Sequence, residues 1–131
     1  MDLHEAAFCG DLSALRKLIE SFGECLDERN RFGHTPLHKA AMNGQLACVI
    51  YLVEGGADVN STDISGCTPL HHAAGNGYVA ICKYLLEIGN ANMNTKSNKG
   101  FSVFTFAKLR GRKDVCTYLQ ESGLLTSEMC T

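Results

Sequence analysis

The stretch Thr-Pro-Leu-His-Lys-Ala at positions 35–40 returns as Thr-Pro-Leu-His-His-Ala at positions 68–73, offset by 33 residues. Positions outside these stretches keep the same offset, since Gly44 recurs as Gly77. A fixed period of this length indicates a repeat array, in which each unit buries its apolar surface against its neighbours. The 131 residues are therefore expected to form one solenoid domain rather than a globule with a single compact core.

Each copy of the stretch has the composition of a helix start. Thr35 and Thr68 stand where a hydroxyl can accept a hydrogen bond from a free backbone N–H of the first turn. The only two prolines of the chain follow them, at the first helical position, where a missing N–H costs nothing. Apolar residues continue at helical spacing, and Gly44 and Gly77 end the helix. A second apolar helix follows in each unit, so the pattern predicts helix–turn–helix repeats.

The motif and its period resemble the ankyrin repeat. The resemblance implies an all-α solenoid of stacked helix–turn–helix units joined by β-hairpin-like loops. We expect a single domain over 1–131, with repeats at about 1–29, 30–62, 63–96 and 97–123 and a tail at 124–131. The first repeat lacks its hairpin and carries one extra residue in its loop, and the third carries one near Asn90. The fourth repeat is degenerate, because Ser-Val-Phe-Thr at 102–105 replaces Thr-Pro-Leu-His.

The histidines of the motif are candidate ligands or bases, and the resemblance implies a different role for them. His38 and His71 belong to the repeated pattern, which implies a buried hydrogen bond from one repeat to its neighbour. His72 occupies the variable place held by Lys39 in the preceding repeat. A zinc site made from Cys67, His71 and His72 is conceivable, but its spacing matches no usual zinc signature. We therefore predict no catalytic, cofactor-binding or metal-binding residues.

Composition excludes several classes of protein. The sequence has no glycine-rich phosphate loop and no nucleophile elbow, so we predict that it is not an enzyme. The absence of tryptophan disfavours an aromatic cage for methylated lysine. Seven cysteines without a Cys-x-x-Cys pair suit a reducing compartment, which predicts a cytoplasmic or nuclear protein. Three of them, Cys48, Cys82 and Cys116, are expected in the core. No signal peptide or membrane-spanning stretch is expected.

Charge is divided unevenly along the chain. Positions 1–63 hold ten acidic and five basic residues, giving −5, whereas positions 64–131 hold four and seven, giving +3. The basic excess lies at Lys96, which directly precedes the fourth repeat, and within that repeat at Lys99, Lys108, Arg110, Arg112 and Lys113. Two interpretations remain open, a solvated end of the array or a docking site for an acidic partner. Nucleic acid is disfavoured as a partner, because the net charge is −2 and no nucleic-acid motif accompanies the patch.

Ankyrin arrays resemble a cupped hand, and the resemblance implies partner contacts at variable positions of the hairpin tips and of the inner-helix palm. The tip positions are Arg31, Phe32, His34, Ile64, Cys67, Lys99 and Phe101, and the palm positions are Met42, Asn43, Asn76, Leu109 and Arg110. Phe32, Ile64 and Phe101 would form an apolar row edged by basic side chains, which is the composition of a protein interface. Alternatively, these apolar residues pack between neighbouring hairpins.

We therefore predict a protein–protein interaction module that binds a protein partner through its hairpin tips and concave inner-helix face, acting as an adaptor or inhibitor. The alternatives are a fragment of a larger ankyrin-containing scaffold or ligase adaptor, or a regulator of a kinase. We expect a monomer without membrane insertion. Asn60 follows Asp58-Val59, with Leu52 eight residues before it. This spacing resembles ankyrin sequences that are hydroxylated at the asparagine, although Asn60 could simply bond within its turn.

Overall fold

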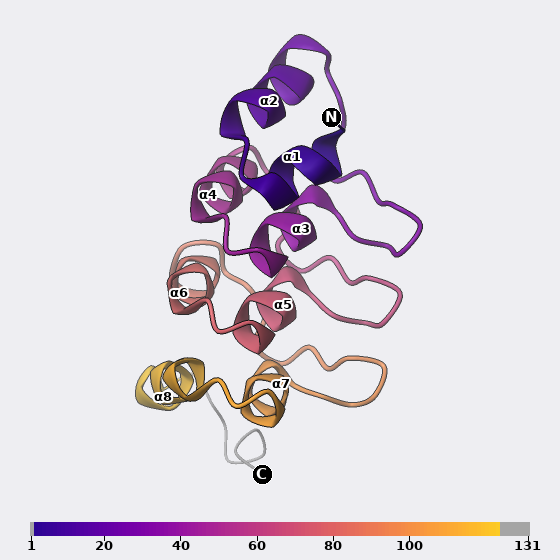
Figure 1. The fold of residues 1–131 in the computed structure, drawn as a ribbon. Helices are drawn as coiled ribbons and strands as arrows, with labels where there is room; N and C mark the ends of the chain where they lie inside the picture. Colours follow the sequence, from indigo (N-terminus) through magenta and orange to yellow (C-terminus); the bar gives the residue numbers. More distant parts are fainter. Residues whose placement is uncertain (1, 124–131) are drawn as a thin grey trace.

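The helices of the protein stack in two columns (Figure 1). The structure is a computed structural model that describes residues 2–123. The inner column holds α1 (Leu3–Cys9), α3 (Pro36–Met42), α5 (Pro69–Gly75) and α7 (Val103–Leu109). The outer column holds α2 (Leu12–Arg16) with the π-helical turn η1 (Lys17–Ser21), then α4 (Leu46–Glu54), α6 (Val79–Glu87) and α8 (Lys113–Glu121).

Hairpin-like loops leave the inner column on one side, away from the outer helices (Figure 1). No strand forms anywhere in residues 2–123, although successive loops lie side by side. The expected all-α solenoid of stacked helix–turn–helix units is therefore confirmed. None of the helices in this described part has the length and apolar character needed to cross a membrane.

The repeated motif starts the inner helices as expected. The Thr35 hydroxyl accepts a hydrogen bond from the backbone N–H of His38, and the Thr35 N–H donates to His38 Nδ1 over 3.1 Å. Thr68 and His71 form the same reciprocal capping box at the start of α5. Two backbone groups that lack helical partners are satisfied in this way at each helix start.

The motif histidines also tie each repeat to the next. His38 Nε2–H donates to the carbonyl of Cys67 over 3.0 Å, and His71 Nε2–H donates to the carbonyl of Phe101 over 3.1 Å. Burial lowers the pKa of His38 from 6.5 to about 4, so its imidazole is neutral at pH 7. The interpretation of these histidines as structural residues is confirmed.

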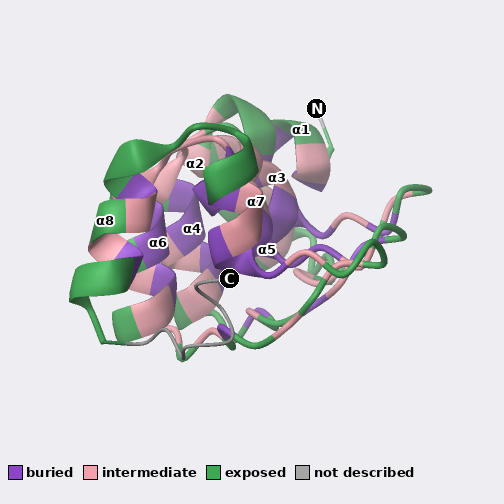
Figure 2. Cartoon of the chain, turned by 90° about the horizontal axis from the view of Figure 1, so that it is seen from below, coloured by how far each residue is buried: buried purple, intermediate pink, exposed green. Residues whose placement is uncertain are grey.

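The core lies between the two columns, and Figure 2 shows buried residues on the sides of helices that face the interior. Leu37 and Leu70 are completely buried, and so are the alanines beside them, whose small side chains let neighbouring inner helices approach closely. Cys48 and Cys82 are in this core, as predicted, but Cys116 is only half-buried. Cys116 lies on α8, the last helix of the described chain, so no further described helix packs over it.

Both one-residue insertions are absorbed at the ends of outer helices. The extra residue of the first repeat coincides with η1, because a π-helical turn accommodates one more residue than an α-helical turn. The extra residue of the third repeat lies after α6, where Asn90 adopts a left-handed φ of 57°. Gly56 holds the corresponding left-handed position after α4. The insertions therefore leave the stacking of the inner column unchanged.

Candidate functional site

A pocket of about 480 Å³ opens between the hairpin loops and the inner helices of the last two repeats. Half of the residues predicted to contact a partner line it: His34, Ile64, Cys67, Lys99, Phe101 and Arg110. They come from three successive loops and from the end of α7, so the solenoid gathers positions that are far apart in sequence. Phe106 of α7 adds an aromatic wall, and the Arg110 guanidinium lies 4.7 Å from the centre of its ring.

Each loop around this pocket makes a turn, and the side chain of the first loop residue stabilises that turn by accepting backbone hydrogen bonds. Asn30 Oδ1 accepts hydrogen bonds from the backbone N–H groups of Phe32 and His34. Asp63 Oδ1 accepts from Ser65 and Cys67 in the same way. These side-chain bonds add to backbone bonds across each turn, in which the N–H groups of Asn30 and Asp63 donate to the carbonyls of His34 and Cys67.

Hydrogen bonds also connect each loop to the next. The Ile64 N–H donates to the carbonyl of Phe32 over 3.1 Å, and Asn98 donates from its side chain to the carbonyl of Ile64 over 2.8 Å. Gly33 is packed so closely against the backbone of Asp63 and Ile64 that an added Cβ would lie 2.9 Å from the Ile64 nitrogen. The tips therefore present their side chains from a connected frame rather than from independent loops.

The apolar tip residues are exposed, which favours an interface over packing between hairpins. Phe32 is 45% exposed and Ile64 is 66% exposed, whereas Phe101 is half-buried in the pocket wall. The guanidinium of Arg31 lies 5.0 Å from the centre of the Phe32 ring. Cations over aromatic rings at the edge of an apolar row match the residue types of protein interfaces.

The palm residues divide into two groups. Leu109 is exposed and Met42 is half-buried, so both present apolar surface on the inner helices. The two asparagines instead link repeats, because Asn43 donates to the carbonyl of Phe8 and Asn76 donates to the carbonyl of Met42, each over 2.9 Å. Their amide groups are thus already engaged within the array.

Cys67 needs a correction, because its side chain is buried and not exposed at a tip. It directly precedes the N-cap Thr68, where its N–H is held by Asp63 and its carbonyl by His38. Burial raises the pKa of its thiol to about 11, with Asp63 adding to the effect. Cys67 therefore offers a partner neither an exposed surface nor a thiolate.

Asn60 is exposed and takes part in the loop frame on the opposite side of the array. Its backbone N–H donates to Asp58 Oδ1 within the turn, and its side-chain Oδ1 accepts from the N–H of Asn92 in the next repeat. The side chain therefore bonds to a neighbouring loop, and the hydroxylation of Asn60 stays a prediction.

Only two of the six basic residues in and just before the fourth repeat lie at the pocket. Lys99 and Arg110 are in its wall, and all six are exposed. Arg112 instead donates from Nε to the carbonyl of Gly75 over 3.0 Å, and so links two repeats as the asparagines do. The positive charge that a partner would meet at the pocket therefore comes from Lys99 and Arg110, beside the carboxylate of Asp63.

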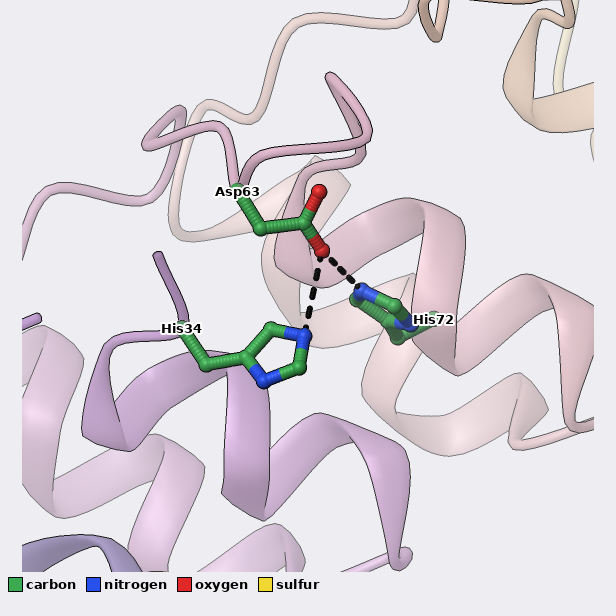
Figure 3. Close-up of side chains that lie close together, drawn as sticks. All are labelled: His34, Asp63 and His72. Carbon is green, nitrogen blue, oxygen red and sulfur yellow. Dashed lines mark hydrogen bonds and ion pairs between the residues drawn. The ribbon is translucent and has the colours of Figure 1, made fainter. Parts of the chain in front are cut away.

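A cluster of His34, Asp63 and His72 lies on the wall of this pocket (Figure 3). Asp63 Oδ2 lies 2.8 Å from His72 Nε2 and 3.3 Å from His34 Nε2. Burial alone would raise the pKa of Asp63, but hydrogen bonds from His72 and the Cys67 N–H hold it well below its ordinary value. The pKa of His34 is lowered by burial and by the neighbouring His72.

Sequence analysis did not predict this cluster. By their place in the repeat, His34 is a tip residue and His72 a variable helix position, and no function was predicted for Asp63. The set that it considered for zinc is not brought together, because both ring nitrogens of His71 are engaged by Thr68 and Phe101. Only part of the signal was present in the sequence: in-register stacking places position 34 beside its counterpart, position 67, and Asp63 reaches Cys67 across its own turn.

The comparison with known families agrees with this geometry. A family model described as ankyrin repeats (3 copies) matches residues 3–97 and 56–128. The chain belongs to the ankyrin repeat family. Membership of this family implies a protein-interaction module, and ankyrin folds are typically not enzymes.

Curated relatives match this ankyrin chain over about half of its length. Inversin from Mus musculus is 42% identical over 63 residues, which are 48% of the chain and 6% of inversin. Ankyrin repeat and SOCS box protein 1 from Homo sapiens is 38% identical over 71 residues, 49% of the chain and 21% of that protein. Palmitoyltransferase AKR1 from Gibberella zeae is 41% identical over 59 residues, 45% of the chain and 8% of that enzyme. The chain thus matches only a small part of each relative.

Proposed function

We propose that this ankyrin-repeat chain binds a protein partner at the pocket between its loops and its inner helices, acting as an adaptor or inhibitor. The observation that carries the proposal is the composition of the pocket wall. Ile64, Phe101 and Phe106 line it together with Lys99 and Arg110. An apolar pocket with two cations at its edge suits a segment that carries an apolar or aromatic side chain next to an acidic one.

The exposed residues beside the pocket extend this surface. Phe32 and Ile64 lie on adjacent tips connected by a backbone hydrogen bond, and Met42 and Leu109 lie on the palm. Because the tips are connected in a frame, binding costs little ordering of the loops. We expect the complex to form from a monomer in the cytoplasm or nucleus, without enzymatic activity of the chain.

The test compares Ile64→Ala with Ile88→Ala in affinity capture from the source cells. Both isoleucines are about equally exposed, at 66% and 64%, but Ile88 follows α6 and lies away from the tips. A partner retained by wild type and by Ile88→Ala, but lost with Ile64→Ala, supports the proposal. Equal retention by all three proteins contradicts it.

Once a partner is identified, its affinity can be measured directly. Truncating an anchor at the centre of an interface typically costs 2 kcal/mol or more, which is about thirtyfold in Kd. We expect this loss for Ile64→Ala and Phe32→Ala, with the midpoint of thermal unfolding close to wild type. Replacing Lys99 or Arg110 should instead lower the association rate and its dependence on salt.

A second candidate is that these repeats serve as the interaction part of a larger scaffold or ligase adaptor. The match to a small part of inversin and of a protein named for its SOCS box favours it. Regulation of a kinase is a further alternative that no residue of the pocket selects. The apparent mass of the protein in its source cells, measured by immunoblot, distinguishes a free module from part of a larger chain.

A further inference from the structure

We propose that His34, Asp63 and His72 form a binding site for a transition-metal ion of the zinc type. One ligand atom from each residue lies within 4.8 Å of the other two. Within residues 2–123 no other three histidine, cysteine or acidic side chains are gathered in this way. The site concerns the free chain, so it does not depend on the proposed binding of a protein partner.

The spacing of the three atoms is close to that of a filled site. Zinc binds imidazole nitrogen and carboxylate oxygen at about 2.0–2.2 Å, so neighbouring ligand atoms of a tetrahedral site lie about 3.4 Å apart. Asp63 Oδ2 already lies 3.3 Å from His34 Nε2 and 2.8 Å from His72 Nε2. Figure 3 shows both imidazoles directed at the same carboxylate oxygen. The ligand atoms of the two histidines lie within 4.8 Å of each other, so shifts of about 1.5 Å or less would let an ion take all three ligands.

The repeat scaffold does not need these three groups at these places. Asp63 closes its turn with Oδ1 alone, as Asn30 does one repeat earlier, which leaves Oδ2 for another role. His72 stands where the preceding repeat has Lys39, and His34 stands where the next repeat has Cys67. The metal-binding groups therefore occur together at a single junction, between repeats two and three.

The ligand atoms select the class of ion. Two imidazoles and one carboxylate suit zinc and its neighbours in the first transition row, whereas magnesium and calcium prefer oxygen ligands alone.

The surroundings leave the imidazoles free to change from proton donors to ligands. Asp63 Oδ2 keeps the proton of His34 on Nε2 in the metal-free chain, whereas His34 Nδ1 is buried and no described residue is bonded to it. Each neutral imidazole can move its proton from Nε2 to Nδ1 and offer the Nε2 lone pair to the ion. The cluster lines the pocket, so a fourth coordination position can take water or a group from a partner.

A bound ion would connect two loops and a helix. His34 belongs to the loop before α3, Asp63 to the loop before α5, and His72 to α5 itself. Ligands from two repeats hold the junction together only in the folded chain. Free zinc at a hundred times Kd should therefore raise the ratio of folded to unfolded protein about a hundredfold.

The test is a calorimetric titration of Zn²⁺ into the full reduced chain, in which Cys9, Cys25 and Cys130 are replaced by serine. Cys9 and Cys25 are exposed free thiols that could bind zinc on their own, and Cys130 lies outside the described residues. We expect one ion per chain and a higher midpoint of thermal unfolding with Zn²⁺ than with EDTA. The same titration with Mg²⁺ should give neither.

Asp63→Asn is the matched variant, because asparagine at the equivalent position 30 closes the same turn. It should fold with a somewhat lower midpoint in EDTA, because the bonds of Asp63 Oδ2 to the two histidines are lost, and lose zinc affinity on the order of a hundredfold or more. His72→Lys, which copies Lys39, should lose affinity similarly and provides the test should Asp63→Asn fail to fold.

Cobalt(II) identifies the ligands by spectroscopy. The serine-substituted chain should give weak visible bands of a nitrogen and oxygen site without the intense near-ultraviolet band of thiolate coordination. No saturable zinc binding, unchanged affinity in the two variants, equal binding of Mg²⁺, or a thiolate band in the serine-substituted chain would each overturn the proposal.

Discussion

The starts of α5 and α7 occupy the same place in successive repeats but are built from different residues. At α5, Thr68 caps the helix and His71 bonds both to Thr68 and to the carbonyl of Phe101 in the next repeat. At α7, Ser102 caps the helix by accepting from the Thr105 N–H, and the two hydroxyls bond to each other over 3.1 Å. Thr105 is too short to reach a neighbouring repeat.

The difference separates two functions of the motif. The cap serves its own helix, so it is present at α7 although Pro and His are gone. The histidine serves the junction with the following repeat, and none follows α7 in the described chain. A degenerate repeat can therefore lose the junction residue without losing its helix start.

The largest loss of folding stability is expected for Leu70→Ala. This substitution tests the packing of the stacked repeats, on which both helix starts depend. Leu70 is completely buried in the core. Truncating a buried leucine costs about 2–5 kcal/mol, and a short array should lose this as one cooperative transition. Thermal unfolding followed by circular dichroism measures it. A midpoint within about a degree of wild type would contradict the burial.

Acid should lower folding stability through His38 and His71, the histidines that bond to the next repeat. The start of α7 has no such histidine, so it should not contribute. The unfolded His38 has a pKa of 6.5 and the folded one about 4, so the unfolded state binds more protons between these values. Stability therefore falls as pH drops from 6.5 to 4, by about 3 kcal/mol from His38 alone. The lowered pKa values of His71 and His34 act in the same direction. Urea unfolding at several pH values measures this slope, and His38→Gln should flatten it.

Separate substitutions of His71 and Thr105 compare how much stability comes from the bond between repeats and how much comes from the helix start. His71→Ala leaves the carbonyl of Phe101 and the N–H of Thr68 without their partner, which costs about 1–3 kcal/mol for each buried group left unpaired. Thr105→Ala leaves the Ser102 cap in place and should cost less than about 1 kcal/mol. Equal losses in urea unfolding would show that the histidine has no separate junction function.

The smallest effects should come from the caps themselves. Thr68→Ala and Ser102→Ala each remove one side-chain acceptor at an N-cap, which typically costs about 1 kcal/mol. The two losses should agree within a few tenths of a kcal/mol in chemical denaturation, because both caps serve only their own helix. A much larger loss for Thr68→Ala would mean that its bond with His71 also supports the junction.

Much of this arrangement could be predicted from the sequence because the period repeats local signals. Thr-Pro at a helix start and glycine after its end are short-range features, read within a few residues. The family pattern then supplied the pairing of helices and the link from His38 to the next repeat. The pocket could be predicted only as a set of variable positions, half of which do line it.

Sequence register alone does not determine how a residue is buried or bonded. Cys67 is at a tip position by register, yet it is buried, and bonds from Asp63 and His38 hold its backbone. Asn43 and Asn76 are on the palm by register, and the structure adds that both are bonded to the preceding repeat, while their contacts with a partner stay a prediction. Burial and hydrogen bonding depend on the adjacent repeat, whose side chains differ from copy to copy.

The array of helices follows from the sequence alone, because caps, prolines and apolar spacing act within one repeat and recur every 33 residues. The cluster of His34, Asp63 and His72 arises only in the tertiary structure. Its members are 29 and 9 residues apart in sequence, and they meet because one loop stacks on the next while α5 faces both. When the repeats stack, residues at different positions of adjacent repeats come into contact. Between repeats two and three, those residues are two histidines and an aspartate.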